Sequence, residues 1–436
     1  MPGLAFDIEW HRADGARSPE LRATWGRLTI HLDEKPVTRV LDHAARSVRD
    51  SIYLPLYPLA EWLAVHWFPL LEEGAVPSRS GCPERHALSR AGEGFAFPDL
   101  RIFSEGEYVR IEWKGYNHPF AEVSFLESGE AELPRGQVRQ ALSSLIEDVI
   151  CRIRSEPLPY TTALEEEWRS VCQMDEEERG FCRAAGALGL DPFSVDETSA
   201  ESIIAVNDAL PASVCDEFFA AAALENLESQ KEWILGAWDK AKDCTAGSED
   251  LAELRAFVQR DWEQLATDEP WKAGYRLARN VRRELGLNGD AIPPGTLRDE
   301  LGLGFAIRAE QSRTFDALAH MDEDSPQGRF VVAGLREDSQ RFDYGRALFE
   351  YLTASAFPRL VSRSRTCRQK ESRAFSAELL APARAIGERL AGDTALPEEI
   401  GDIAAVFGVS EMVIFHQIQN HGLASLADAR WPWSGR

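Results

Sequence analysis

The chain has 436 residues, of which 44% are hydrophobic, and a formal net charge of −24 at pH 7. This length suits two or three domains, each with a sizeable core. The acidity excludes non-specific binding of nucleic acid or of anionic membranes by the chain as a whole, because such binding needs clustered cations, but it leaves room for a local basic groove.

The first 157 residues predict a domain that mixes strands and helices. Residues 21–33 partly alternate between apolar and polar side chains, as a half-buried strand does. The stretch 58–68 is apolar nearly all round, so we expect a helix at the centre of the domain. Prolines at 55, 58 and 69 break the apolar run 51–71, which therefore does not predict a membrane span.

The second half of this domain predicts a hairpin. Residues 94–106 and 107–115 are rich in aromatic and β-branched side chains, and Ser104-Glu105-Gly106 between them is a natural turn. We expect a third strand at 120–125. Apolar residues at helical spacing then predict a helix over 134–154.

The rest of the chain predicts a helical middle and a C-terminal domain. Residues 164–265 are acidic and helical in pattern, so we expect a connector or docking surface there. Residues 271–426 predict a helix, then strands, then further helices that end in a pair around Gly408. The fold class we expect is α+β, with three parts at 1–157, 164–265 and 271–426.

The cysteines and the N-terminus favour a cytoplasmic protein. The seven cysteines are scattered and contain no C-x-x-C pair, which is typical of free thiols in a reducing compartment. The first fifteen residues have neither the basic stretch nor the apolar segment of a signal peptide.

One set of residues in the hairpin has the pattern of a catalytic site. Asp99 follows a proline and lies thirteen residues before Glu112, and Lys114 is two residues further on. Asp99 and Glu112 on adjacent strands can share a Mg²⁺, which prefers oxygen ligands. Lys114 points to the same face as Glu112 and can activate or orient a water molecule. The pattern resembles the PD-(D/E)XK nuclease motif, and that resemblance makes Glu61, on the preceding helix, a candidate for a further acidic residue.

A structural role explains the same residues without a metal. An exposed E-x-K on a hairpin is common, and an ion pair between Lys114 and Asp99 needs no cofactor. A turn centred on Glu105 pairs Asp99 with Ile111, which puts Glu112 on the opposite face unless a bulge or an offset turn corrects the register. The cations near the hairpin are few: Arg79, Arg85, Arg90, Arg101, Arg110, Lys114, Arg135 and Arg139.

The stretch 339–382 has the outline of a zinc-peptidase core. It begins with Arg341-Phe342 and a helix-like run to Leu352, and it ends in the sequence AELLAP. This outline resembles the ImmA/IrrE family of metallopeptidases, which typically reads RFTLAHELGHYL and later ExxAxxFAAELLMP. The resemblance implies a zincin-like fold in the C-terminal domain.

The residues at the metal-binding positions depart from that family. Arg346 and Glu350 stand where the resemblance implies the two histidines of H-E-x-x-H, and Ala347 stands at the general base. The distal acidic position falls on Glu371 by its E-x-x-A context, or on Gln369 by counting back from Phe375. Zinc prefers His and Cys, and arginine cannot deprotonate to bind it. We therefore expect no zinc, and ion pairs from Arg346 to Glu350 and Glu371.

Two hypotheses for function follow. The first is a pseudo-peptidase without a cofactor, which binds a peptide or protein partner through the groove around Arg346, Glu350 and Glu371 and acts as a sensor, regulatory or assembly subunit. The ImmA/IrrE resemblance implies a bacterial stress, mobile-element or phage-response system. The alternative is a Mg²⁺-dependent nuclease in the N-terminal domain, regulated by the C-terminal domain. Whether the chain is an enzyme stays open, but it is not expected to be a zinc peptidase.

Overall fold

The structure is a computed structural model that describes most of the chain. The described residues are 3–11, 15, 18–75, 82–92, 94–119, 121–156, 158, 160–243, 249–262, 269–287, 289, 291–293, 306–309, 312, 314–322, 325–334 and 336–426. The chain divides into two compact units, residues 1–204 and 205–436. The helical connector expected over 164–265 is shared between these units and does not form a unit of its own.

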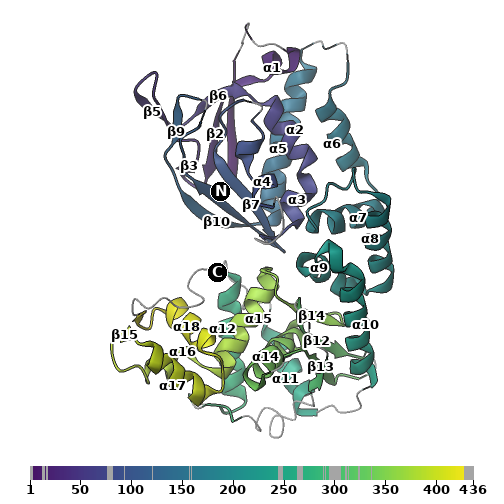
Figure 1. Ribbon diagram of the computed structural model, residues 1–436, viewed down its shortest axis with the longest axis vertical. Helices are drawn as coiled ribbons and strands as arrows, with labels where there is room; N and C mark the ends of the chain where they lie inside the picture. The colour runs from purple at the N-terminus through teal and green to yellow at the C-terminus, as the bar shows by residue number, and fades with distance from the viewer. Residues whose placement is uncertain are drawn as a thin grey trace. The chain divides into compact units, whose positions relative to one another are not determined.

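Antiparallel sheets form the framework of the first unit (Figure 1). One sheet joins β1, β2, β3 and β6, a second joins β5, β4 and β9, and a third joins β10, β8 and β7. The strands are β1 (Leu4–Trp10), β2 (Trp25–Leu32), β3 (Lys35–Pro36), β4 (Val40–Asp42), β5 (Ser47–Arg49), β6 (Ile52–Pro55), β7 (Asp99–Glu105), β8 (Tyr108–Lys114), β9 (Val123–Phe125) and β10 (Gly129–Pro134).

The third strand of the hairpin sheet is not the one that the sequence predicts. The strand expected at 120–125 corresponds to β9, which pairs with β4, while residue 120 lies outside the described residues. The partner of β8 is β10. The backbone N–H of Gly115 donates to Ser128 Oγ at 2.9 Å, which helps to bring the chain back alongside β8 after β9.

Helices cover the sheets of this unit, and α2, α5 and α6 pack against one another (Figure 1). The helix expected over 58–68 is split into α2 and α3 at His66. Pro69 causes the break, because its ring clashes with the carbonyl four residues earlier and it has no N–H to donate. The helices are α1 (Pro19–Ala23), α2 (Tyr57–Val65), α3 (Trp67–Glu72), α4 (Cys82–Arg85), the short 3₁₀ helix η1 (Leu88–Arg90), α5 (Arg135–Arg154), α6 (Ala163–Gln173), α7 (Glu176–Ala187) and α8 (Glu197–Ala209).

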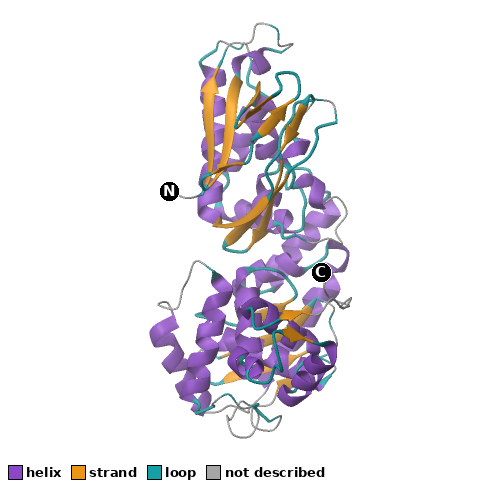
Figure 2. Ribbon diagram, turned by 90° about the vertical axis from the view of Figure 1, so that its left-hand side faces the viewer, coloured by secondary structure: helices purple, strands orange, loops and turns teal. Residues whose placement is uncertain are grey.

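The second unit has a central sheet surrounded by helices (Figure 2). The sheet order is β11-β13-β12-β14, and β12 is antiparallel to both of its neighbours. The strands are β11 (Ala306–Arg308), β12 (Phe315–Met321), β13 (Gly328–Val332) and β14 (Arg359–Ser362), with a separate pair, β15 (Thr394–Ala395) and β16 (Ser425–Leu426).

Two helices of this unit, α14 and α15, pack on each other and carry most of the stretch 339–382. Helix α12 lies against α15 so closely that a Cβ on Gly274 would come within 2.3 Å of the Glu371 carbonyl oxygen, which explains the glycine there. The helices are α9 (Ala212–Ala221), the 3₁₀ helix η2 (Leu224–Asn226), α10 (Leu227–Asp243), α11 (Glu249–Asp261), α12 (Pro270–Glu284), α14 (Glu337–Thr353), α15 (Cys367–Leu380), α16 (Ala383–Gly387), α17 (Pro397–Phe407) and α18 (Glu411–His421).

The observed architecture confirms the mixed α+β class. Helices take up 53% and strands 20% of the structure, so neither type of element dominates alone. Five cysteines of the described residues are free thiols, at positions 151, 172, 182, 215 and 367. In the part of the chain that the structure describes, we find no helix with the length and apolar character needed to cross a bilayer.

Candidate functional site

The turn between β7 and β8 decides which hairpin residues share a face. The strands are joined by the two residues Gly106 and Glu107, and Gly106 adopts a positive φ of 82° that suits glycine. This turn places Asp99 opposite Lys114 and Arg101 opposite Glu112. The register centred on Glu105 is therefore wrong, and the offset turn puts the acidic and basic residues of the motif on one face without a bulge.

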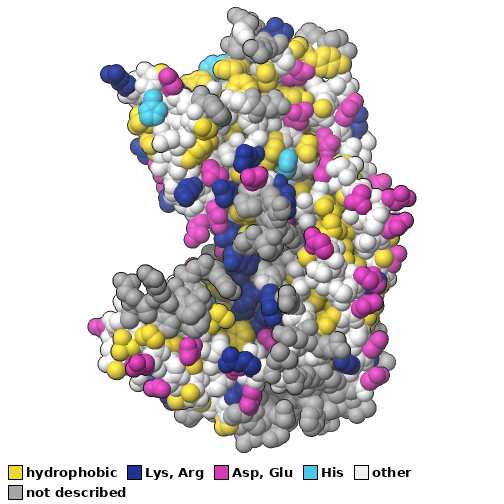
Figure 3. Space-filling view, in the orientation of Figure 1, with side chains coloured by type: hydrophobic (Ala, Val, Ile, Leu, Met, Phe, Trp, Pro, Cys, Tyr) yellow, Lys and Arg dark blue, Asp and Glu magenta, His cyan; other side chains and the backbone are white. Residues whose placement is uncertain are grey.

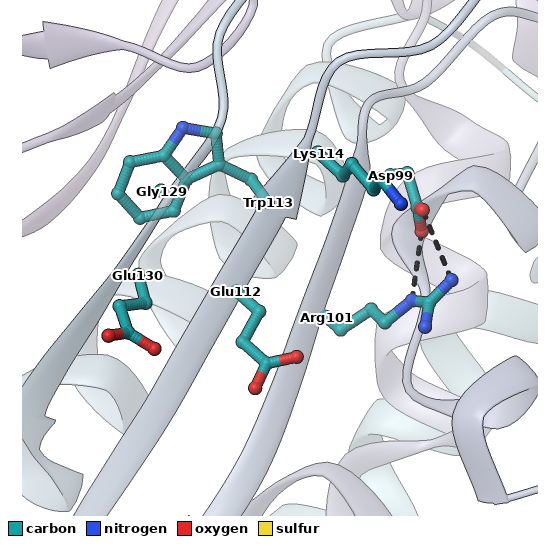
Figure 4. A pocket seen from close by; sticks show the side chains of 7 residues that line it. All are labelled: Asp99, Arg101, Glu112, Trp113, Lys114, Gly129 and Glu130. Carbon is teal, nitrogen blue, oxygen red and sulfur yellow. Dashed lines mark hydrogen bonds and ion pairs between the residues drawn. The ribbon is translucent and has the colours of Figure 1, made fainter. Parts of the chain in front are cut away.

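A pocket of about 430 Å³ opens on this face at the end of the hairpin. Asp99, Glu112 and Lys114 all line it (Figure 4), so the structure brings together the three residues of the D…E-x-K pattern. The other lining residues are Arg101, Trp113, Gly129 and Glu130.

Arginines neutralise both carboxylates of the motif in this structure. Arg101 donates from Nε and Nη2 to the two oxygens of Asp99 at 3.0 and 3.1 Å (Figure 4). Arg110 Nη1 lies 2.6 Å from Glu112 Oε1. Because the Arg101 side chain is 38% exposed, its pair with Asp99 is weakly held and open to competition from another cation.

The lysine of the motif is free to act on a ligand. Lys114 is exposed and has no ion-pair or hydrogen-bond partner among the described residues. Its ammonium group extends toward Asp99, across the pair of strands (Figure 4). Half-buried Tyr116 lies nearby, and its pKa is raised to about 12, first by burial and then by the negative charge of Asp99.

Glu130 is a pocket residue that the sequence analysis missed. It lies on β10 directly opposite Glu112, and both side chains point to the same side of the sheet (Figure 4). Two carboxylates in directly opposed positions repel each other, and a cation between them relieves that repulsion. The missed signal is the strand itself, because the sequence GEAELP is short, begins with a glycine and ends with a proline, and buries only Leu133.

Glu61 does not join these residues. It lies on α2, and its carboxylate accepts a hydrogen bond from the Tyr57 hydroxyl at 2.8 Å. It does not line the pocket. The pKa of Tyr57 is raised, first by burial and then by its hydrogen bond to Glu61. Glu61 therefore has a local structural partner one turn away on its own helix.

The donor set of the pocket fits Mg²⁺ better than Zn²⁺. Asp99, Glu112 and Glu130 offer only oxygen donors, and no group of three His, Cys, Asp or Glu that could hold a metal occurs among the described residues. Mg²⁺ is usually bound through one or two carboxylates, keeps several waters and contacts substrate phosphates. Zinc in proteins takes three or four close ligands, mostly nitrogen and sulfur.

In the second unit, Arg346 is a buried structural residue with a different partner from the one expected. The guanidinium lies 2.7 Å from Asp316 Oδ2 on β12 and donates to Gln369 Oε1 at 2.6 Å. It also donates to the Ser362 carbonyl at 2.5 Å and to Ser372 Oγ at 3.3 Å. The expected ion pairs to Glu350 and Glu371 are wrong, because four groups on β12, β14 and α15 already surround the guanidinium.

Glu350 and Glu371 each face another neighbour. Glu350 is fully buried and pairs with Arg368 at 2.8 Å and with Arg359 at 3.4 Å. Glu371 is two residues beyond Gln369 on α15, about 200° further round the helix, so it faces α12 when Gln369 faces α14. Of the two candidates for the distal position, only Gln369 lies beside Arg346.

Asp343, one turn before Arg346, gives a prediction about pH. Burial, and then the negative charge of Asp316, raise the pKa of Asp343 to about 7, although Arg346 and Arg363 oppose this. Between pH 4 and 7 the folded protein therefore holds a proton that the unfolded chain has lost, so stability falls as the pH rises through this window. Asp343→Asn removes this dependence. We expect the free energy of unfolding of Asp343→Asn, relative to that of the parent, to rise by roughly 2 kcal/mol between pH 5 and 8.

Urea unfolding of both proteins at the two pH values measures this difference. Asp393→Asn is the matched control, because Asp393 is an exposed aspartate of the same unit. Its difference from the parent should be the same at both pH values. A constant difference for Asp343→Asn as well would mean that Asp343 is already ionised in the folded protein at pH 5.

The comparisons with known proteins assign no family to this chain. No model of a protein family matches it, and no curated protein is significantly similar to it.

Proposed function

We propose that the N-terminal unit is a Mg²⁺-dependent nuclease that hydrolyses phosphodiester bonds at the hairpin pocket. The observation that supports it most is the two-residue turn, which places Asp99, Glu112 and Lys114 on one face around a pocket. A shift of the hairpin register by one residue would put Asp99 on the opposite face from Glu112 and Lys114. The observed register is one that keeps all three side chains on the same face.

Each residue has a role that follows from its position. Asp99 and Glu112 would hold the metal ion, and the negative charge of Glu130, opposite Glu112, would help to attract it. The ion supplies charge neutralisation of the phosphate and a more acidic bound water. In the reaction, water adds to phosphorus and the P–O bond to the leaving alcohol breaks, so negative charge develops on the non-bridging phosphate oxygens. Lys114 would donate a hydrogen bond to one of these oxygens or to the attacking water. Arg101 would be released from Asp99 and left to face the phosphate.

Cleavage assays on the full chain test this proposal. Single- and double-stranded DNA and RNA, each labelled at one end, are incubated with Mg²⁺, Mn²⁺ or EDTA. We expect cutting of at least one substrate with either metal and none with EDTA. The absence of cutting with all four substrates and both metals would remove the proposal.

A second candidate function concerns the C-terminal unit, for which we propose a non-catalytic ImmA/IrrE-like module. Supporting it are the adjacent helices α14 and α15, with Arg346 and Gln369 in contact at positions where the resemblance implies metal ligands. In this proposal the module is a sensor, regulatory or assembly subunit of a bacterial stress, mobile-element or phage-response system, and it works in the cytoplasm.

The mode of partner binding in this candidate depends on α9. This helix packs along β14, at the edge of the sheet. Ser213 Oγ donates to the Pro358 carbonyl at 2.8 Å, and the Glu217 carboxylate accepts hydrogen bonds from Ser364 at 2.6 Å and Thr366 at 3.0 Å. A peptide that adds to the edge of β14, as in strand addition, would have to displace α9.

A further inference from the structure

Helix α12 presents a straight row of cations to solvent. Lys272, Arg276, Arg279 and Arg283 are all exposed and follow one another at intervals of four, three and four residues. At 100° per residue these positions lie within about 60° of one another round the helix. The opposite face is buried, with Leu277, Ala278 and Val281 among its core residues. These four cations are called the α12 stripe below.

Few acidic groups neutralise the α12 stripe. Lys272 lies 2.8 Å from Glu269, and Arg279 lies 2.7 Å from the buried carboxylate of Glu378. Arg283 donates to the neutral Asn280 side chain at 2.6 Å. Arg276 has no ion-pair or hydrogen-bond partner among the described residues. Both side chains of the Lys272–Glu269 pair are exposed, so this ion pair is weak.

Most of the described arginines near the hairpin pocket contrast with this row, because they are paired with carboxylates, while Arg139 is exposed. Arg101 and Arg110 neutralise the motif, as described above, and the other partners are Glu73 for Arg85, Glu84 for Arg90 and Glu72 for Arg135. Arg79 lies outside the described residues. A polyanion that approaches this acidic chain therefore finds more available positive charge on α12 than on the paired arginines beside the pocket.

The surface of the C-terminal unit shows the same concentration. In the space-filling view, Lys and Arg side chains gather at the place where α12 and α15 lie in Figure 1 (Figure 3). Lys370 of α15 lies 5.8 Å from the ring of Trp271, the residue just before the α12 stripe, so α15 extends the basic region at this end.

We propose that the α12 stripe binds the sugar–phosphate backbone of nucleic acid. The distance along the helix from Lys272 to Arg283 is about 16 Å, which matches about five phosphates at 3.4 Å per nucleotide along one strand. Three of the four cations are arginines, whose planar guanidinium donates two parallel hydrogen bonds to phosphate. The choice of nucleic acid over another polyanion rests on the proposed nuclease function.

Binding of labelled nucleic acid in EDTA tests the stripe without any contribution from cleavage. Fluorescence anisotropy of a 20-nucleotide duplex and of the single strand is measured with the full chain at 50 to 200 mM salt. The stripe variant combines Lys272→Ala, Arg276→Ala and Arg283→Ala, and keeps Arg279 because of its contact with buried Glu378. The control variant, with the same change in charge, combines Lys240→Ala, Arg336→Ala and Arg384→Ala, which are exposed cations of the same unit.

We expect the stripe variant to bind at least tenfold more weakly than the parent at 50 mM salt. The slope of log K against log salt should fall by about 2 to 3, because each lost phosphate contact removes about 0.7 to 0.9. The control should bind within about twofold of the parent. Melting curves of all three proteins, followed by circular dichroism, show whether the variants are folded.

Three outcomes would overturn the proposal. In the first, the parent does not bind nucleic acid. In the second, the stripe variant binds with the affinity and salt slope of the parent. In the third, poly-L-glutamate binds at the stripe and nucleic acid does not, which would assign the surface to an acidic protein. If nucleic acid binds through the α12 stripe but the protein cleaves none of the substrates, the nuclease proposal fails and the proposal of nucleic-acid binding by the stripe remains.

Discussion

The Arg346→Ala variant is expected to unfold with about 3–5 kcal/mol less free energy than the parent at pH 7. The guanidinium is 3% exposed and is bound by Asp316, Gln369, Ser362 and Ser372. Removing one partner of a buried ion pair leaves the other charge and its neighbours without compensation, which accounts for a cost of this size. For a unit of this length the melting temperature should fall by roughly 10 °C.

Calorimetry of the full chain checks this result. Because the chain divides into two compact units, we expect the transition of residues 205–436 to move and that of residues 1–204 to stay. Arg384→Ala is the control, since its side chain is 90% exposed and its loss should change stability by no more than about 0.5 kcal/mol. An Arg346→Ala protein as stable as this control would show that the guanidinium is not held as described.

A double-mutant cycle separates the ion pair from the rest of the network. Arg346→Met keeps most of the side-chain volume, and Asp316→Asn removes the charge of its partner. Asp316 also lies 2.9 Å from Arg363, so each single substitution leaves part of the network in place. We expect the double variant to be more stable than the sum of the two single effects predicts, by about 0.5–3 kcal/mol.

The second large effect is expected at the hairpin pocket, where Asp99→Asn and Lys114→Ala should each slow cleavage at least a hundredfold. Groups that position or transfer a proton, or that stabilise charge in the transition state, usually contribute this much or more. The two variants should differ in how they respond to metal. Asp99→Asn should need a higher Mg²⁺ concentration for half-maximal rate, whereas Lys114→Ala should keep the Mg²⁺ dependence of the parent.

Initial rates over a range of Mg²⁺ concentrations measure both quantities. Lys240→Ala and Asp393→Asn are matched controls, because they remove an exposed lysine and an exposed aspartate of the other unit. Loss of the partly exposed pair between Asp99 and Arg101 should cost at most about 1 kcal/mol, so lost activity would not reflect unfolding. Cleavage at the parental rate in both pocket variants would place the activity elsewhere.

Local periodicity in the sequence determined most of the helices. The buried positions of α5, which include Val138, Leu142, Leu145 and Val149, recur every three or four residues, so the predicted helix over 134–154 is confirmed almost to the residue. The pair around Gly408 is confirmed as α17 and α18, and Gly408 ends α17 with a φ of 60°. These features depend on neighbours along the chain, which a sequence displays directly.

The strands of the C-terminal sheet depend on surroundings that the sequence does not display. Strand β12 is buried at nearly every position, because it is central in the sheet and covered by helices, and so it lacks the alternation that reveals a half-buried strand. The sequence pattern predicts neither β12 nor the short edge strand β14. Strand β10 was missed for the opposite reason, since only Leu133 of its residues is buried.

Only the tertiary structure decided the two candidate sites. In the hairpin, residue identity and spacing predicted the acidic and basic set, but a turn of two residues instead of one centred on Glu105 reverses which side chains share a face. In the C-terminal unit, the resemblance drew attention to Arg346. Its partner Asp316 is thirty positions away on β12, a strand that local pattern did not reveal, so the ion pair arises only when the helix packs on the sheet.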